Sequence, residues 1–176
     1  QAGIHITNCT TLNVSNSIYY LDNDIIDSTA STCIYIKAEN ITLDCQTHNI
    51  GAKLWVGDDG VAIYNNFAVI QNCNFSLWSQ SAINLRTTTF SNFTNINILN
   101  DWDGFYSPYS NANNYSIFKN IYIYNGNDGF YIKGNNNTFI NCLSDGVSGG
   151  SGFYMSGYNN TFINSSSKNN KYGFSI

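Results

Sequence analysis

Hydrophobic and polar positions follow a pattern that recurs every 21 to 25 residues along the chain. The pattern is clearest in the last third of the chain, where a four-residue motif that begins with glycine recurs at Gly129–Ile132, Gly152–Met155 and Gly173–Ile176. Steps of 21, 23, 25, 22 and 22 residues back from Phe174 reach only apolar residues, namely Phe153, Phe130, Phe105, Ile83 and Val61. A second apolar position follows two residues later in every repeat but one. Because neighbouring side chains of a strand point to opposite faces, this spacing predicts six stacked strands with an inward, outward, inward pattern.

A column of asparagines keeps the same period. Its members are Asn72, Asn95, Asn120, Asn141 and Asn164, and each follows a bulky apolar residue by two positions. We expect an inward-facing ladder at a bend, in which each amide bonds to the amide one turn away, roughly 4.8 Å off. The alternative, that these amides contact a ligand, is less favoured because buried amides usually satisfy one another.

A repeat of this length holds about three short strands and three turns, which is typical of a solenoid. The sequence therefore predicts an all-β fold, a right-handed parallel β-helix of about six turns. We expect one domain over residues 1–176, in which residues 1–32 form an N-terminal cap and residues 33–176 form the repeated turns.

A resemblance to a known family lies in Cys33–Ile50, which is written CIYIKAENITLDCQTHNI. This stretch resembles the phrase that commonly opens right-handed parallel β-helix repeat proteins, a group that includes the periplasmic copper-site maturation protein NosD and many archaeal surface proteins. Thr47 stands where the family usually has glycine, which affects the local turn. The resemblance implies the fold and an archaeal source, but no activity, since this fold supports many unrelated functions.

The composition of the chain argues against some classes of binding partner. Only 10 % of the 176 residues are charged, the net charge is −4, and Lys and Arg together number seven. These values argue against a nucleic-acid or anionic-membrane partner. No run of about eighteen apolar residues is present, so we expect no membrane span. The chain opens at Gln1 rather than Met, from which we expect a removed signal peptide and a secreted protein.

Asn-x-Ser/Thr sequons are denser than the composition alone would give, and in a secreted chain they predict N-glycosylation. The predicted sites are Asn8, Asn13, Asn40, Asn74, Asn92, Asn114, Asn136 and Asn159. A ninth sequon, at Asn164, is the weakest candidate because the ladder turns it inward.

Five cysteines lack the spacing of a zinc site, so disulfides are expected outside the cell. Cys45 with Cys73 and Cys9 with Cys33 are the favoured pairs, and Cys33 with Cys45 is the rival; Cys142 is expected to be a buried thiol. Asp22, Asp24 and Asp27 carry the oxygens that Ca²⁺ uses, but without the glycine and spacing of a calcium loop they predict a solvated turn. No cofactor or metal is expected.

The C-terminal residues suggest a structural role. Phe174 and Ile176 are the inward residues of the last strand, so an apolar cross-section and unpaired backbone groups are expected there. Our leading expectation is therefore a non-enzymatic protein that assembles head to tail with itself into an extracellular filament or a surface layer.

The alternative is a carbohydrate-active protein, either a polysaccharide lyase or hydrolase or a sugar-binding module. Asp103 and Asp128 are expected about 5 Å apart on neighbouring turns, with Asp101 nearby. Tyr106, Tyr131 and Tyr154 form an outward ladder that could stack on sugar rings, including surface glycans. Against an active site, Asp-Gly is also a common turn signal. The scarcity of basic residues, with Arg86 the only arginine, argues against an enzyme that acts on uronates.

Overall fold

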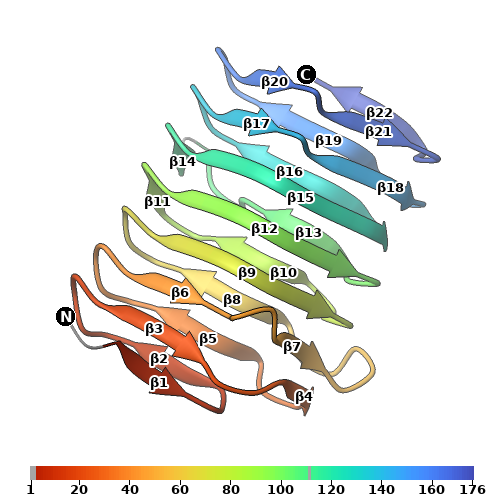
Figure 1. Ribbon diagram of the computed structural model, residues 1–176. Coiled ribbons are helices and arrows are strands. Elements are labelled where there is room, and N and C mark those ends of the chain that lie inside the picture. The colour runs from red at the N-terminus through yellow and green to blue at the C-terminus, as the bar shows by residue number, and fades with distance from the viewer. Residues whose placement is uncertain (1–2, 111) are drawn as a thin grey trace.

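The computed structural model describes residues 3–110 and 112–176, and this part of the chain is all β. The chain winds through about seven stacked turns of a parallel β-solenoid, and the pairings between its described strands are all parallel. Two sheets face each other as two layers, with the apolar core between them (Figure 1).

The larger layer is a twelve-stranded sheet. Its strands are β1 (Ile4–Ile6), β3 (Ile18–Leu21), β4 (Ile25–Ser28), β6 (Thr42–Asp44), β7 (Asn49–Ala52), β9 (Val69–Ser76), β12 (Asn92–Leu99), β15 (Ile117–Gly126), β17 (Thr138–Ile140), β18 (Leu143–Val147), β20 (Thr161–Ile163) and β21 (Ser166–Lys168). The long strands β9, β12 and β15 run across this face in one piece, whereas other turns cross it in two strands.

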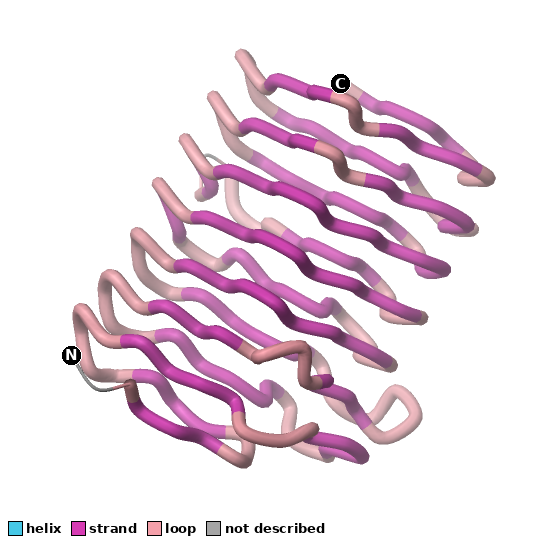
Figure 2. The backbone as a smooth tube through the Cα atoms, viewed as in Figure 1, coloured by secondary structure: helices cyan, strands magenta, loops and turns pink. Residues whose placement is uncertain are grey.

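The facing layer is an eight-stranded sheet, and a two-stranded sheet lies beside it. The eight strands are β2 (Thr10–Leu12), β5 (Thr32–Ile36), β8 (Asp59–Ile63), β10 (Ser81–Leu85), β13 (Asp103–Tyr106), β16 (Asp128–Lys133), β19 (Ser151–Ser156) and β22 (Tyr172–Ser175). The small sheet pairs β11 (Thr88–Thr89) with β14 (Asn113–Asn114). Figure 2 shows the connecting loops stacked above one another along both edges.

The register confirms the apolar column predicted from the sequence. Val61 pairs with Ile83, Ile83 with Phe105, and the column continues from Phe105 through Phe130 and Phe153 to Phe174. These side chains are fully buried except Phe174, which is 44 % exposed.

Two columns of phenylalanines fill the core between the sheets. Phe93, Phe118, Phe139 and Phe162 stack along one layer, with neighbouring ring centroids 4.6 to 4.9 Å apart. Rings of the two layers meet edge to face, as Phe105 and Phe118 do at 5.2 Å. Stacked and edge-to-face pairs are the favoured aromatic arrangements, so one side-chain type can fill successive turns without rearranging the backbone.

The N-terminal segment expected as a cap is continuous with the solenoid. β1 pairs with β3, β2 with β5, and β4 with β7, so residues of the first 32 add a turn to the sheets, which accounts for about seven turns rather than six. Two disulfides, Cys9–Cys33 and Cys45–Cys73, tie neighbouring turns together, as predicted, and Cys142 is a buried free thiol. Since disulfides persist in oxidising environments, the two bridges indicate an extracellular setting.

The asparagine ladder forms, but its inward orientation was wrong. The Nδ2 atom of Asn95 donates to Asn72, that of Asn120 to Asn95 and that of Asn141 to Asn120, at 3.0 to 3.1 Å. Their side chains lie on the outer surface, half-buried or exposed. Each of these residues has a left-handed backbone, with φ between 53° and 55°, and this turns the side chain outward at the bend.

Candidate functional site: the groove around Trp102

Trp102 lies on the loop between β12 and β13, and 53 % of its side chain is exposed. None of the ring contacts between described residues involves it, so both of its faces are free of other aromatic rings. Trp55, 44 % exposed, lies on the loop that projects between β7 and β8 (Figure 1). Leu54 and Trp55 both have a left-handed backbone there, at φ 41° and 68°, a conformation that costs energy and is often found at functional sites.

Trp102 borders three pockets, which together we call the Trp102 groove. The first has a volume of about 330 Å³ and is lined by Trp55, Asn100, Asp101, Trp102, Asn125, Gly126, Asn127, Ser148 and Gly149. The second, of about 400 Å³, is lined by Gln80, Trp102, Asp103, Tyr106, Asn127, Asp128 and Tyr131. The third, of about 340 Å³, is lined by Trp55, Ser79 and Trp102 and so lies between the two tryptophans.

The groove follows the solenoid axis because its lining residues come from successive turns. Asn100 and Asn125 occupy equivalent corners, and the Asn125 Nδ2 atom donates to the Asn100 Oδ1 atom at 3.1 Å. Ser148 continues the same edge one turn further, where its backbone N–H donates to the Gly126 carbonyl at 2.9 Å. Successive turns repeat at roughly the strand spacing of 4.8 Å, so the wall offers amides at a regular interval.

In the second pocket, each of two carboxylates accepts a backbone N–H from the next turn of the solenoid. The Asp103 Oδ1 atom accepts the Asp128 backbone N–H at 3.2 Å, and the Asp128 Oδ1 atom accepts the Ser151 backbone N–H at 2.6 Å. The Asn127 Nδ2 atom lies between them, 3.3 Å from Asp103 Oδ1 and 3.0 Å from Asp128 Oδ2. The structure thus brings together Asp103 and Asp128, as the sequence predicted.

Burial changes the protonation of the acids in this region. Asp103 is only 7 % exposed; this burial, with the nearby charge of Asp128, raises its pKa to about 7 against the hydrogen bond from Asn127. Asp101 is 1 % exposed, and desolvation raises its pKa well above the usual value, although its Oδ1 atom accepts the Trp78 backbone N–H at 2.6 Å. The Oδ2 atom of Asp101 has no hydrogen-bond partner among the described residues. Asp101 therefore supports the corner through the Oδ1 atom, which holds the Trp78 backbone N–H.

The tyrosine ladder forms, but its rings cover one another. Tyr131 and Tyr154 stack at 4.5 Å with 6° between their planes, and Tyr106 lies 5.5 Å from Tyr131. A ring covered on its face cannot take a sugar there, so the ladder presents edges and hydroxyl groups to the second pocket. Among the described residues that line the three pockets, the aromatic rings without a ring contact are Trp102 and Trp55, which sequence reasoning missed. The signal was available, because Trp102 stands between the two candidate acids Asp101 and Asp103.

The Asp-Gly pairs at residues 103–104 and 128–129 open strands β13 and β16. Their glycines are required by packing: a Cβ atom on Gly104 would lie 2.5 Å from the Ile123 Cδ1 atom, and one on Gly129 would lie 2.3 Å from the Ser144 Oγ atom. The acids can therefore lie at the mouth of the groove because glycine lets the strand pass close to the core.

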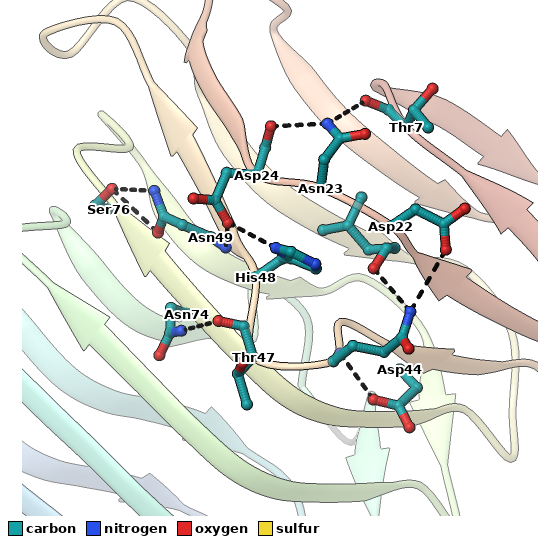
Figure 3. Close-up of polar contacts among 12 residues, drawn as sticks. Thr7, Asp22, Asn23, Asp24, Asp44, Thr47, His48, Asn49, Asn74 and Ser76 are labelled. Carbon is teal, nitrogen blue, oxygen red and sulfur yellow. Dashed lines mark hydrogen bonds and ion pairs between the residues drawn. The ribbon is translucent and has the colours of Figure 1, made fainter.

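The predicted glycosylation sites lie on the outer surface to different degrees. Exposed sites are Asn8, Asn13, Asn40, Asn92 and Asn159, and half-buried sites are Asn74, Asn114 and Asn136. The Asn74 Nδ2 atom, to which a glycan would be attached, donates to the Thr47 carbonyl (Figure 3). The ladder residue Asn164 is exposed rather than turned inward, so its sequon is open as well.

The two histidines of the chain, His5 and His48, each contact an aspartate on an N-terminal turn. The His48 Nδ1 atom lies 2.9 Å from Asp24 and the His5 Nδ1 atom 2.8 Å from Asp22. Figure 3 shows Asp24 within a chain of polar contacts that also includes Asn49 and Ser76. The Asn49 backbone N–H, with His48, lowers the pKa of Asp24. Among the described residues, no group of three His, Cys, Asp or Glu side chains could hold a metal ion.

Phe174 lies on β22 and Ile176 just after it, and the structure leaves them 44 % and 82 % exposed. Phe174 stacks on Phe153 at 4.7 Å, so one face of its ring continues the core and the other is open.

Comparisons with protein-family models, with curated proteins and with solved structures find no match to this chain. No described helix is long and apolar enough to cross a membrane. What the fold itself defines is a class: the chain is a parallel β-solenoid with stacked phenylalanines in its core and a tryptophan-lined groove at one corner.

Proposed function

We propose that this protein is a secreted, glycosylated β-solenoid that binds a polysaccharide along the Trp102 groove. The observation that carries the proposal is Trp102 itself, an exposed indole with no stacked ring, bordered by pockets whose walls are amides and carboxylates. An aromatic face covers the apolar face of a sugar ring, while amide and carboxylate groups bond to its hydroxyls. The two disulfides and the resemblance of Cys33–Ile50 to archaeal surface proteins support a cell-surface location.

The same contacts favour binding over cleavage. Asp103 and Asp128 each hold a backbone N–H of a neighbouring turn, so both serve the ladder of the solenoid. Hydrolysis by two carboxylates needs an acid and a second carboxylate placed on opposite sides of the bond to be broken. Here both acids lie on one wall, bridged by Asn127. We propose a non-enzymatic role, and release of new reducing ends from a bound polysaccharide would contradict it.

Replacing Trp102 with alanine should weaken glycan binding by at least about tenfold, because aromatic residues at the centre of an interface commonly account for a large part of the binding free energy. Affinity electrophoresis through gels containing a panel of polysaccharides measures the effect. Tyr158→Ala is the matched control, since Tyr158 is 66 % exposed and borders none of the three pockets. Equal loss in both variants, or none in Trp102→Ala, would contradict the proposal.

Self-association is the second candidate function. The phenylalanine columns reach Phe162 and Phe174, whose rings meet edge to face at 5.2 Å, and the open side of Phe174 would be covered by one more turn of the same kind. That turn could come from another copy or from more of the same chain. If copies associate head to tail, Phe174→Asp with Ile176→Asp should abolish filaments in negative-stain electron microscopy while the monomer stays folded. Filaments of normal length from this variant would exclude the idea.

A further inference from the structure

The Trp102 groove is acidic as well as aromatic. Its lining includes Asp101, Asp103 and Asp128, and among the described residues that line the three pockets there is no lysine, arginine or histidine. Lys133 does not line a pocket, but its Nζ atom lies 5.2 Å from the centre of the Tyr131 ring, which borders the second pocket, and donates to the Pro108 carbonyl at 3.3 Å. With carboxyl groups and no basic side chain in its lining, the groove favours a cationic or neutral glycan over an anionic one.

The only arginine is committed as well. The Arg86 Nη2 atom lies 3.6 Å from the Asp59 Oδ2 atom, and Asp59 is 1 % exposed. This ion pair joins β8 to the residue that follows β10, and neither Arg86 nor Asp59 borders any of the three pockets. Any ligand of the groove must consequently bring its own positive charge or none.

Asp103 provides a specific place for such a charge. It is more than nine-tenths buried yet borders the second pocket, and both of its hydrogen bonds within the protein are made by the Oδ1 atom. No described residue bonds to its Oδ2 atom. Trp102, the residue before Asp103 in the chain, and Asp128 border the same pocket. An ammonium group near Oδ2 would gain a charge-assisted hydrogen bond from the carboxylate and a cation–π contact from the indole face.

The volume suits a sugar ring rather than a bare ion. The second pocket has about 400 Å³, within the range of about 300–1,000 Å³ found for small-molecule sites. Asn127 and Gln80 border it together with the edges of Tyr106 and Tyr131, and these groups can bond to ring hydroxyls on either side of an amine.

We propose that the second pocket of the Trp102 groove selects glycans that carry free amino groups, such as glucosamine-containing chains, over N-acetylated, neutral and uronic-acid chains. This selectivity rests on the proposed glycan binding and adds a ligand class to it. The amine is held by Asp103 and Asp128, and the sugar ring by Trp102.

The test compares two ligands that differ only at the nitrogen. Isothermal titration calorimetry with a glucosamine hexamer and an N-acetylglucosamine hexamer, at pH 7 and low salt, should give at least about tenfold tighter binding of the free amine. In Asp103→Asn with Asp128→Asn the ratio of the two affinities should fall towards one, because the amides keep the shape but lose the charge. Thermal unfolding of the variant checks that it is folded.

The outcomes separate the two proposals. Equal affinity for both hexamers, or a preference that survives in the double variant, overturns the amino-sugar selectivity while glycan binding stands. Binding of neither hexamer nor any polysaccharide of the panel overturns the proposed function itself. Spermidine is the control for a general cation site: if it displaces the glucosamine hexamer at a similar concentration, the pocket recognises amines without a sugar and the inference fails.

Discussion

Replacing Phe118 with alanine is expected to lower the free energy of unfolding by about 4 kcal/mol, the middle of the range of about 3–5 kcal/mol for buried phenylalanines. Phe118 is fully buried and stacks between Phe93, at 4.9 Å, and Phe139, at 4.6 Å. It also meets Phe105 and Phe130 edge to face, so its loss opens a cavity that both layers of the core share. The backbone ladder on either side is tied to neighbouring turns, which limits how far the cavity can collapse.

Phe90→Ala is the matched control for that measurement. Phe90 is also stacked between two rings, 5.6 Å from Phe67 and 5.0 Å from Tyr115, but 51 % of it is exposed. Its replacement should cost less than about 1 kcal/mol, because little apolar area leaves the core. Guanidinium chloride unfolding, followed by tyrosine and tryptophan fluorescence with the disulfides intact, gives both values. Similar losses in the two variants would show that stacking, rather than burial, stabilises the solenoid.

The fold was predictable from the sequence because every turn of a solenoid has the same packing requirements. Each turn must place an apolar side chain over the one below, so the column from Val61 to Phe174 could be counted along the chain, and the observed register is the counted one. The Cys45–Cys73 disulfide followed from the same repeat, because these cysteines lie on adjacent turns with Cα atoms 4.8 Å apart.

The asparagine ladder shows where the alternation of inward and outward residues along a strand fails. Between Phe93 and Ile96, both buried, lie two outward residues rather than one, because Asn95 has a φ of 55° and the left-handed residue breaks the alternation. Strict alternation places Asn95 inward. Asparagine tolerates the left-handed conformation better than most residues, so five asparagines at one position are a conformational signal as much as a hydrogen-bonding one.

A loop can also bury residues on the outer face of a sheet, and the sequence repeat does not predict this. Ala62 and Asn84 occupy the outward position of their strands, yet both are fully buried. Asn84 donates to Asp59 at 3.0 Å, next to the contact between Asp59 and Arg86. A hydrogen bond to Tyr109, on the loop after β13, raises the pKa of Arg86 and joins that loop to the cluster. This contact joins Arg86 to a residue 23 positions further along the chain, and the alternation of residues within a strand does not predict it.

The candidate site was predicted in part. Asp103 and Asp128 meet because they share a register position, which the sequence shows. Trp55 and Trp102 meet at the third pocket because two loops of different length reach the same corner, and the repeat says nothing about how far an insertion projects. The sequence thus located the acids of the groove, and the structure added its aromatic surface.

The protein is expected to be more stable at pH 4.5 than at pH 8, the reverse of what surface ion pairs would give. Burial raises the pKa of Asp59, Asp101 and Asp103, so the folded state holds protons that the unfolded state releases near pH 4. Stability therefore falls as the pH rises from about 4 through the folded pKa values. For Asp103, whose folded pKa is about 7, the change between pH 4.5 and pH 8 is about 3 kcal/mol at about 1.4 kcal/mol per pH unit. Below pH 4 the slope reverses, because Asp24 and Asp44 have lowered pKa values.

Asp101→Asn with Asp103→Asn should flatten this dependence. An asparagine at either position can still accept the backbone N–H that the aspartate accepts, from Trp78 or from Asp128, and it carries no proton to lose. Thermal unfolding at pH 4.5 and pH 8 should therefore show a smaller difference in the double variant than in the native protein, chiefly because the variant gains stability at pH 8. Asp27→Asn removes a charge from an exposed position of β4 and serves as the control for net charge. If the double variant keeps the native pH dependence, the buried acids of the Trp102 groove are not the groups that release protons on unfolding.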